Sequence, residues 1–278
     1  MGKSSKMDKD AGGNLNPYDK LLQECEKDLE KKPGDPDVWV KKGLALSKLN
    51  RYEEAVLAFE KALQKKGNDP TIWFSKGVAL GSTGRHEEAI KAFSKALEIN
   101  PDDYYVWFNK GVALGSMGRF VEAIEAFEKT LEHDSCDPFA LMNKGIALGE
   151  LGRQEEAVQS YEKAAEIFPN DPAIWLNKGV ALGSLGRNEE AMRDFEKALQ
   201  LNPKDPSAWI NKGVLLGEMG QYDEALKVYE KAMDLDPENP SAWMNKAAAL
   251  AGLGRHEDAR LAYEKAEELN QFMGNQWN

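Results

Sequence analysis

Five asparagines spaced 34 residues apart are the side chains in this sequence best suited to binding chemistry: Asn109, Asn143, Asn177, Asn211 and Asn245. Lys41 and Ser75 occupy the two earlier positions of the same column. A side-chain amide offers one acceptor and two donors, so a ladder of amides can pair with the main chain of an extended peptide of any sequence. The alternative is that each amide bonds within its own repeat.

Two apolar columns follow the same 34-residue spacing. The first contains Val40, Phe74, Phe108, Met142, Leu176, Ile210 and Met244, and the second contains Leu44, Val78, Val112, Ile146, Val180, Val214 and Ala248. At about 100° per helical residue, both columns lie on the same side as the asparagines. Contiguous exposed apolar surface usually marks an interaction site. The pattern favours a ligand groove, although curvature of a stacked array would also bury many of these side chains.

A column of glycines also faces this side: Gly81, Gly115, Gly149, Gly183 and Gly217. Glycine inside a helix costs roughly 1 kcal/mol relative to alanine, so five in register need a physical reason. Close approach of a ligand backbone is one explanation. Fraying of the helix before its end is the other, and the sequence does not separate them.

Catalytic chemistry finds little support. His86 and His256 occupy one column five repeats apart, and His133 stands alone, so no metal cluster is predicted. No serine or cysteine has a base at a fixed spacing, and the paired acids are typical of the solvated first turn of a helix. We therefore expect no enzyme activity, no cofactor and no metal.

The elements that position these columns are pairs of helices, one pair per 34 residues. Tryptophan recurs at Trp39, Trp73, Trp107, Trp175, Trp209 and Trp243, with Leu141 in the remaining position. Glycines such as Gly186 end the first helix, and Asp-Pro pairs such as Asp171-Pro172 begin the next unit. The second helix, for example 188–201, is amphipathic and is expected on the outside, whereas the first is apolar nearly all round.

This pattern resembles the tetratricopeptide repeat (TPR). The period is 34, with glycine four residues after tryptophan, alanine twelve later, an aromatic residue four beyond that and proline near the end. Members of these columns include Ala55, Ala89, Ala191, Phe59, Tyr161, Tyr263, Pro101, Pro169, Pro203 and Pro237. The resemblance implies an all-α, right-handed solenoid superhelix of helix-turn-helix units that binds protein segments in its concave groove.

The family's clamp for carboxyl-terminal peptides needs lysine and asparagine where this chain has residues such as Leu176 and Val180, so that specificity is not expected here. A lysine column does exist: Lys42, Lys76, Lys110, Lys144, Lys178, Lys212 and Lys246. We expect its stems to pack between repeats and its ammonium groups to reach acids on a neighbouring helix, which is a structural role.

The array is expected to have closed ends. Residues 1–16 are interpreted as a disordered tail and 17–35 as a half-repeat capping helix. Seven units then span 36–273 (36–69, 70–103, 104–137, 138–171, 172–205, 206–239, 240–273), followed by a tail at 274–278. In the last unit, Arg260 and Glu267 replace apolar residues that would face a next repeat. We therefore expect both to be exposed, whereas Ile124 and Leu131 in the third unit should be buried.

Composition limits the compartment and the partners. A net charge of −11 and a pI near 5 argue against a basic nucleic-acid surface. No apolar run is long enough for a membrane span, and no signal peptide is recognisable. Cys25 and Cys136 are 111 residues apart, so free thiols in a reducing compartment are expected. These observations favour a cytoplasmic protein that binds neither nucleic acid nor membrane.

The sequence thus predicts a non-enzymatic scaffold that binds an extended, partly apolar protein or peptide segment. Two alternatives remain open. One is a self-associating protein whose groove receives its own or a neighbour's tail, and the other is an accessory module of an enzyme complex. Phe272, Met273 and Trp277 make the C-terminal segment apolar. We expect residues 271–278 either to occupy a groove, with Trp277 as anchor, or to fold back as a lid over the last repeat.

Overall fold

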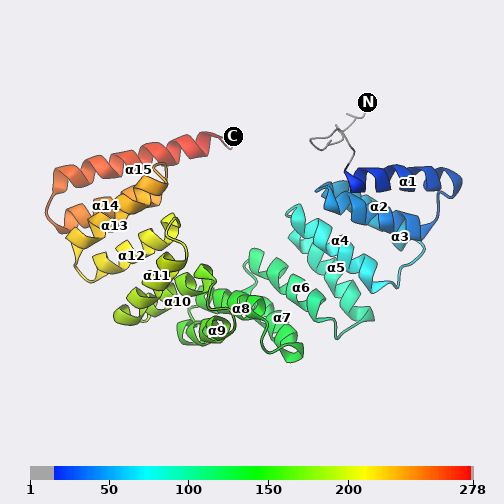
Figure 1. Cartoon of the computed structure of the whole chain (residues 1–278), viewed down its shortest axis with the longest axis horizontal. Coiled ribbons are helices and arrows are strands. Elements are labelled where there is room, and N and C mark those ends of the chain that lie inside the picture. The colour runs from blue at the N-terminus through cyan, green and yellow to red at the C-terminus, as the bar shows by residue number, and fades with distance from the viewer. Residues whose placement is uncertain (1–15, 277–278) are drawn as a thin grey trace. The chain divides into compact units, whose positions relative to one another are not determined.

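The structure is a computed structural model that describes residues 16–276, and within this range it contains 15 α-helices and no strand (Figure 1). The first seven helices are α1 (Pro17–Lys31), α2 (Pro36–Lys48), α3 (Tyr52–Leu63), α4 (Pro70–Ser82), α5 (His86–Ile99), α6 (Tyr104–Ser116) and α7 (Phe120–His133). The other eight are α8 (Pro138–Glu150), α9 (Gln154–Ile167), α10 (Pro172–Ser184), α11 (Asn188–Leu201), α12 (Pro206–Glu218), α13 (Tyr222–Leu235), α14 (Pro240–Gly252) and α15 (His256–Gln276). The predicted all-α architecture is confirmed.

The helices form two compact units, one ending at Ser135 and the other beginning at Cys136. Within each unit every helix packs against the next one along the chain. The even-numbered helices also contact one another, as in α2 with α4 and α10 with α12. These even-numbered helices are the first helices of the repeats, so each unit has an inner layer of first helices and an outer layer of second helices.

Side-chain caps and left-handed glycines set the helix boundaries. Asp171 begins α10, because its Oδ1 accepts a hydrogen bond from the Ala173 N–H at 2.9 Å, and Pro172 fills the first helical position. Gly186 follows the end of α10 with φ of +72°. There the N–H of Arg187 donates to the Leu182 carbonyl at 3.0 Å, which satisfies an end carbonyl. These repeated start and stop residues therefore give the helices from α2 to α14 nearly equal lengths.

The core of the first six repeats contains an aromatic ring packed on a glycine. A Cβ atom at Gly179 would lie 2.7 Å from Cε1 of Phe195, and one at Gly213 would lie 2.4 Å from Cε1 of Tyr229. Only glycine leaves room for the ring, so the two helices approach closely. The seventh repeat has Ala247 at this position, and its aromatic residue, Tyr263, is 47% exposed.

The second helices are amphipathic, as predicted. In α11 the side chains of Ala191, Phe195 and Ala198 are buried, and Glu196 on the opposite face is exposed. The tryptophans of the first helices are half-buried, and each fixes the preceding loop. The indole Nε1–H of Trp175, for example, donates to the Pro169 carbonyl at 2.8 Å.

The C-terminal end differs in part from the expectation. Arg260 is exposed and paired with Glu257, Glu267 is exposed, and Ile124 is buried, all as predicted. Leu131, however, is half-buried, whereas Leu97 and Leu199 at the same repeat position are buried. It lies on α7, the last helix of its unit, so no following helix of that unit covers it. The array therefore ends on a charged helix face.

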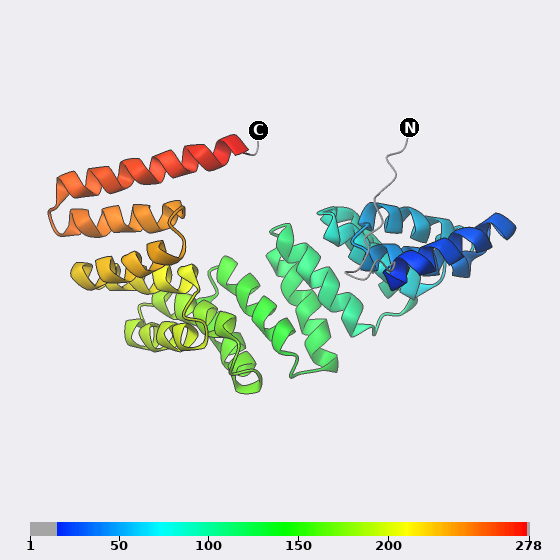
Figure 2. The same cartoon turned by 45° about the horizontal axis from the view of Figure 1, so that its top comes forward.

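Residues 271–276 neither fold back as a lid nor enter a groove of their own chain, because they extend α15 as helix to Gln276. Figure 2 shows α15 lying along α14 and running past its end. The side chain of Phe272 on this extension is 56% exposed. Trp277 and residues 1–15 of the predicted tail at 1–16 lie outside the described residues, whereas Asn16 caps α1. Among the described helices, none combines the length and apolarity needed to cross a membrane.

Candidate functional site

The second apolar column stays open to solvent on the first helices. Its members Leu44, Val78, Val112, Ile146 and Val180 are between 37% and 47% exposed, Val214 is half-buried, and Ala248 is exposed. Exposed aliphatic side chains in register on successive helices form a continuous apolar strip within each unit. We call this strip the valine column.

The first apolar column belongs partly to the core. Its members Val40, Phe74, Phe108, Met142, Leu176 and Ile210 are half-buried, and Met244 is exposed. The Phe74 ring lies 6.0 Å from that of Phe93, and the Phe108 ring lies 6.0 Å from that of Phe127. Packing therefore explains part of this column, as the alternative reading of the sequence allowed.

Three of the predicted ladder asparagines bond within their own helices. The Nδ2 of Asn109 donates to the Tyr105 carbonyl at 2.8 Å, Asn143 to Phe139 at 2.8 Å, and Asn177 to Ala173 at 2.9 Å. One amide hydrogen is thereby used inside the repeat, which is the alternative that the sequence left open. Each amide has one more N–H and an oxygen, so a reduced ladder of these groups stays a prediction.

Two clefts in register bring the predicted columns together. In the unit that ends at Ser135, a cleft between α4 and α6 is lined by Val78, Gly81, Asn109 and Val112. In the other unit, the same positions three repeats later line a cleft between α10 and α12: Val180, Gly183, Asn211 and Val214. In both units one ladder asparagine and two residues of the valine column thus line the same cleft.

The helix-interior glycines leave these clefts open. A Cβ atom at Gly81 or Gly115 would meet no other atom within 4 Å, and one at Gly183 would meet only Leu215 Cδ1 at 3.7 Å. All three are the second-to-last residues of their helices, so the helix end and a ligand backbone both stay open as explanations. Internal packing therefore supplies no reason for glycine at these positions.

The two clefts differ in their polar rims. His86 lines the α4–α6 cleft, and its Nδ1 is buried without a hydrogen-bond partner. Glu218 lines the α10–α12 cleft instead, whereas the equivalent serines Ser82 and Ser184 line one cleft each. The two clefts therefore share an apolar floor but present different polar groups to a ligand.

Comparisons with known proteins identify the family. Sequence models described as "tetratricopeptide repeat" or "TPR repeat" match residues 40–104, 104–135, 145–186, 172–205 and 210–273. The chain is a tetratricopeptide-repeat protein. No curated protein sequence matches it significantly.

Several solved structures share the fold of this TPR protein. A tetratricopeptide-repeat protein from Parabacteroides merdae has a TM-score of 0.72 and 17% identity, covering 84% of this chain and 93% of its own. YrrB, described as a TPR protein with an unusual peptide-binding site, has a TM-score of 0.56 and 25% identity, covering 66% of this chain and 95% of its own. MamA has a TM-score of 0.54 and 24% identity, covering 59% of this chain and 96% of its own.

The sequence reasoning missed two exposed aromatic side chains of this TPR protein, Tyr105 and Phe139. Each lies one helical turn before a ladder residue, Asn109 or Asn143. Following the asparagine column back by four residues would have found them, because residues i and i+4 share a helix face. They enlarge the candidate site of each unit.

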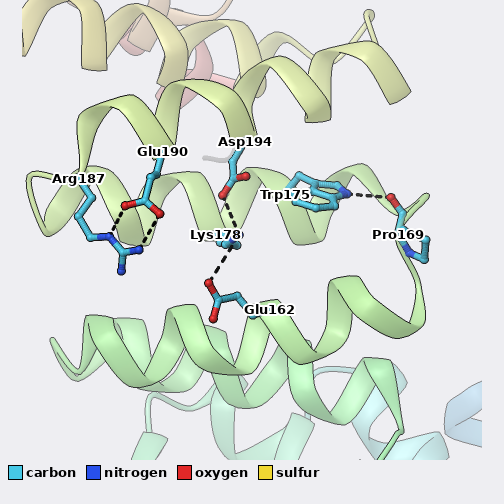
Figure 3. A network of polar contacts seen from close by, with 7 residues as sticks. All are labelled: Glu162, Pro169, Trp175, Lys178, Arg187, Glu190 and Asp194. Atoms are coloured by element: carbon cyan, nitrogen blue, oxygen red, sulfur yellow. Dashed lines mark hydrogen bonds and ion pairs between the residues drawn. The ribbon is translucent and has the colours of Figure 1, made fainter.

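The lysine column has the predicted structural role. Figure 3 shows Lys178 of α10 between Glu162 of α9 and Asp194 of α11, at 3.9 Å and 3.4 Å from its Nζ. Lys42, Lys76 and Lys212 likewise pair with acids on the preceding helix. Lys110 faces a different environment, since Ser94 occupies the corresponding acidic position, and burial lowers the pKa of Lys110.

Two aspartates, Asp19 and Asp194, are buried although the helical pattern did not place a charge in the interior. In Asp194 the cause can be traced. Burial raises its pKa above the ordinary value of 3.8, while Lys178 opposes this shift. Ala58, Ala92 and Ala126 occupy the same column in earlier repeats. The Asp194–Lys178 pair joins the two helices of one repeat, whereas the Lys178–Glu162 pair reaches the preceding repeat. Across residues 16–276, no group of three or more His, Cys, Asp or Glu side chains could hold a metal ion.

Proposed function

We propose that this TPR protein is a non-enzymatic scaffold that binds a protein or peptide segment on its first helices. The observation that carries the proposal is the pair of equivalent clefts, each lined by a ladder asparagine and two residues of the valine column. The likeness to YrrB, whose description includes a peptide-binding site, supports a ligand of the same kind.

The ligand would be extended and partly apolar. Its side chains would pack on the valine column, since exposed aliphatic surface gains from leaving water. Its main chain would pass the open glycines closely and would bond the amide groups that Asn109 and Asn211 keep beyond their helices. This accounts for a glycine column that packing does not explain.

A random-peptide display library selected against the whole chain tests the proposal. Peptides that bind are then titrated calorimetrically against the double variant V180T/V214T. Threonine keeps the β-branched shape but adds a hydroxyl, so we expect roughly tenfold weaker binding as two apolar contacts are lost. The control is Leu57→Thr, which changes an exposed side chain on α3 of the outer layer. Equal losses in both variants, or no loss in V180T/V214T, would refute a groove site.

Self-association is a second candidate, favoured by the exposed Phe272 on the extension of α15. A neighbouring chain would then supply the apolar segment. Light scattering should give a mass above 31.0 kDa that falls to the monomer value on Phe272→Ser. A monomeric wild-type protein at high concentration rules this candidate out.

A further inference from the structure

Three aromatic rings form a stack at the start of α6, and this stack has no counterpart in the other first helices described. Tyr104 occupies the first helical position, where α2, α4, α8, α10, α12 and α14 have proline. Its ring stacks on His133, the last residue of α7, with centroids 4.1 Å apart and planes 12° apart. The Tyr105 ring also lies against Tyr104, with ring centroids 4.1 Å apart and planes tilted by 32°.

The stack ends in an open face beside the candidate groove. Tyr105 is 60% exposed, although it is a large aromatic residue. It lies one turn before Asn109, whose amide donates to the Tyr105 carbonyl. The neighbouring rings hold Tyr105 in place, so a ligand that packs on it has little side-chain freedom left to freeze. Rigid, exposed aromatic residues are typical anchors of binding sites.

Two carboxylates flank the stack. Asp103 precedes Tyr104 and caps α6, accepting from the Val106 N–H at 3.3 Å, and Asp134 follows His133. The hydrogen bond with Tyr105, burial and the negative charges of Asp134 and Asp103 raise the pKa of Tyr104 to about 12. Tyr104 therefore stays neutral at physiological pH, and the site combines aromatic faces with the negative charges of Asp103 and Asp134. A cation is the complementary ligand.

We propose that the Tyr104–Tyr105–His133 stack binds an arginine side chain of the segment held in the groove. The planar guanidinium would stack on the open face of Tyr105 as a fourth layer, with Asp103 and Asp134 supplying charge. Arginine suits this site better than lysine, because the guanidinium is flat and more weakly hydrated than an ammonium group. This inference rests on the proposed function for the rest of the ligand.

The stack also fixes the register of the ligand. The column of Tyr105 contains Asp37, Thr71, Phe139, Ala173, Ser207 and Ser241 in the other repeats. Phe139 is the other aromatic member, and it rests on Phe168, with ring centroids 6.3 Å apart. An arginine of the ligand would therefore bind at Tyr105, the aromatic position that two acids, Asp103 and Asp134, flank.

Single-residue probes test this inference apart from groove binding. We would titrate N-acetyl-arginine amide, N-acetyl-lysine amide and N-acetyl-citrulline amide into the whole chain labelled with ¹³C-tyrosine, and follow the ring resonances by NMR. Citrulline keeps the shape of arginine without its charge. We expect the arginine probe to shift the Tyr104 and Tyr105 resonances at millimolar concentration, the lysine probe several-fold more weakly, and citrulline hardly at all.

Two variants sharpen the test. D103N/D134N removes both charges but keeps a good helix cap, since asparagine caps as well as aspartate, and it should weaken arginine binding about fivefold. Tyr105→Ala should abolish the shift at Tyr104. Equal shifts from arginine and citrulline, equal shifts from arginine and lysine, or unchanged binding in D103N/D134N would overturn the proposal. Selected peptides that still bind in that case would leave the groove function standing.

Discussion

At the scale of single residues, two glycine columns that look alike in sequence have opposite physical roles. A Cβ atom at Gly111 would lie 2.7 Å from Cε1 of Phe127, whereas one at Gly115, one turn later in α6, would meet nothing within 4 Å. Gly111→Ala should therefore destabilise the protein by about 1–3 kcal/mol through overpacking. Gly115→Ala should stabilise it by up to about 1 kcal/mol, because alanine is the better helix former.

Thermal unfolding followed by circular dichroism distinguishes the two variants, which share one helix and one chemical change. Destabilisation by Gly115→Ala would mean that the open space is not real. If Gly115→Ala instead stabilises the chain but weakens peptide binding, the glycine is retained for the ligand.

The sequence predicted which residues form the site columns, but not the hydrogen bonds and burial of each side chain. Helical periodicity placed Val180 and Asn177 on one face, and the structure places them on the same face of α10. Periodicity could not reveal that the Asn177 amide bonds to Ala173, because that bond depends on rotamer choice. It also missed buried Asp194, since only contact with Lys178 makes a carboxylate tolerable there.

At the scale of elements, an arginine–glutamate pair supports the start of most second helices. Arg51, Arg85, Arg119, Arg153 and Arg187 each pair with the glutamate three residues later at 2.6 to 2.7 Å. Figure 3 shows Arg187 forked on Glu190. The hydrogen bond from Arg187 holds the pKa of Glu190 below its ordinary value of 4.5, and the other four glutamates shift in the same direction.

These pairs predict a loss of stability in acid. Because the folded-state pKa values are lowered, the stabilisation is fully present above about pH 4.5. It is lost as the pH falls through the folded-state values. Asp194 acts in the opposite direction, since its raised pKa favours the protonated folded form, but it is one group against five. The melting temperature should therefore fall steadily below pH 4.5.

Melting curves from pH 7 to pH 3 check this expectation. Below pH 4.5, Glu190→Gln should make the melting temperature depend less steeply on pH. Adding 0.5 M salt should have the same effect, since the pairs are exposed and salt screens them. A melting temperature that rises on acidification would mean that buried carboxyls, rather than these pairs, dominate.

Most helix boundaries could be predicted, because characteristic residues mark where the helices begin and end. Asp-Pro begins a helix such as α10, and a left-handed glycine such as Gly186 ends its turn. The predicted end of the last unit was wrong, because neither an Asp-Pro pair nor a left-handed glycine follows Glu267 among the described residues. Without a stop, the helix continues to Gln276, and Phe272 becomes an exposed helical side chain instead of part of a lid.

At the scale of the whole molecule, contacts join neighbouring helices only within a few positions along the chain. The free energy of unfolding of such an array is approximately the sum of contributions from each repeat and from the interfaces between neighbouring repeats. The fragment 136–278, which contains α8 to α15, should therefore fold without the preceding residues and unfold cooperatively on heating. Circular dichroism of the fragment tests this, and a fragment that shows no cooperative transition would contradict the division at Ser135.

The central claim is that the valine column contacts a protein segment. Methyl NMR of the whole chain with labelled valines measures this directly, using a peptide selected from the display library. We predict that the methyl resonances of Val78, Val112, Val180 or Val214 shift on binding. Those of Val121, which is exposed on outer helix α7, and of buried Val158 should stay in place. Shifts confined to Val121, with the valine column unchanged, would place the ligand on the outer helices and contradict the account.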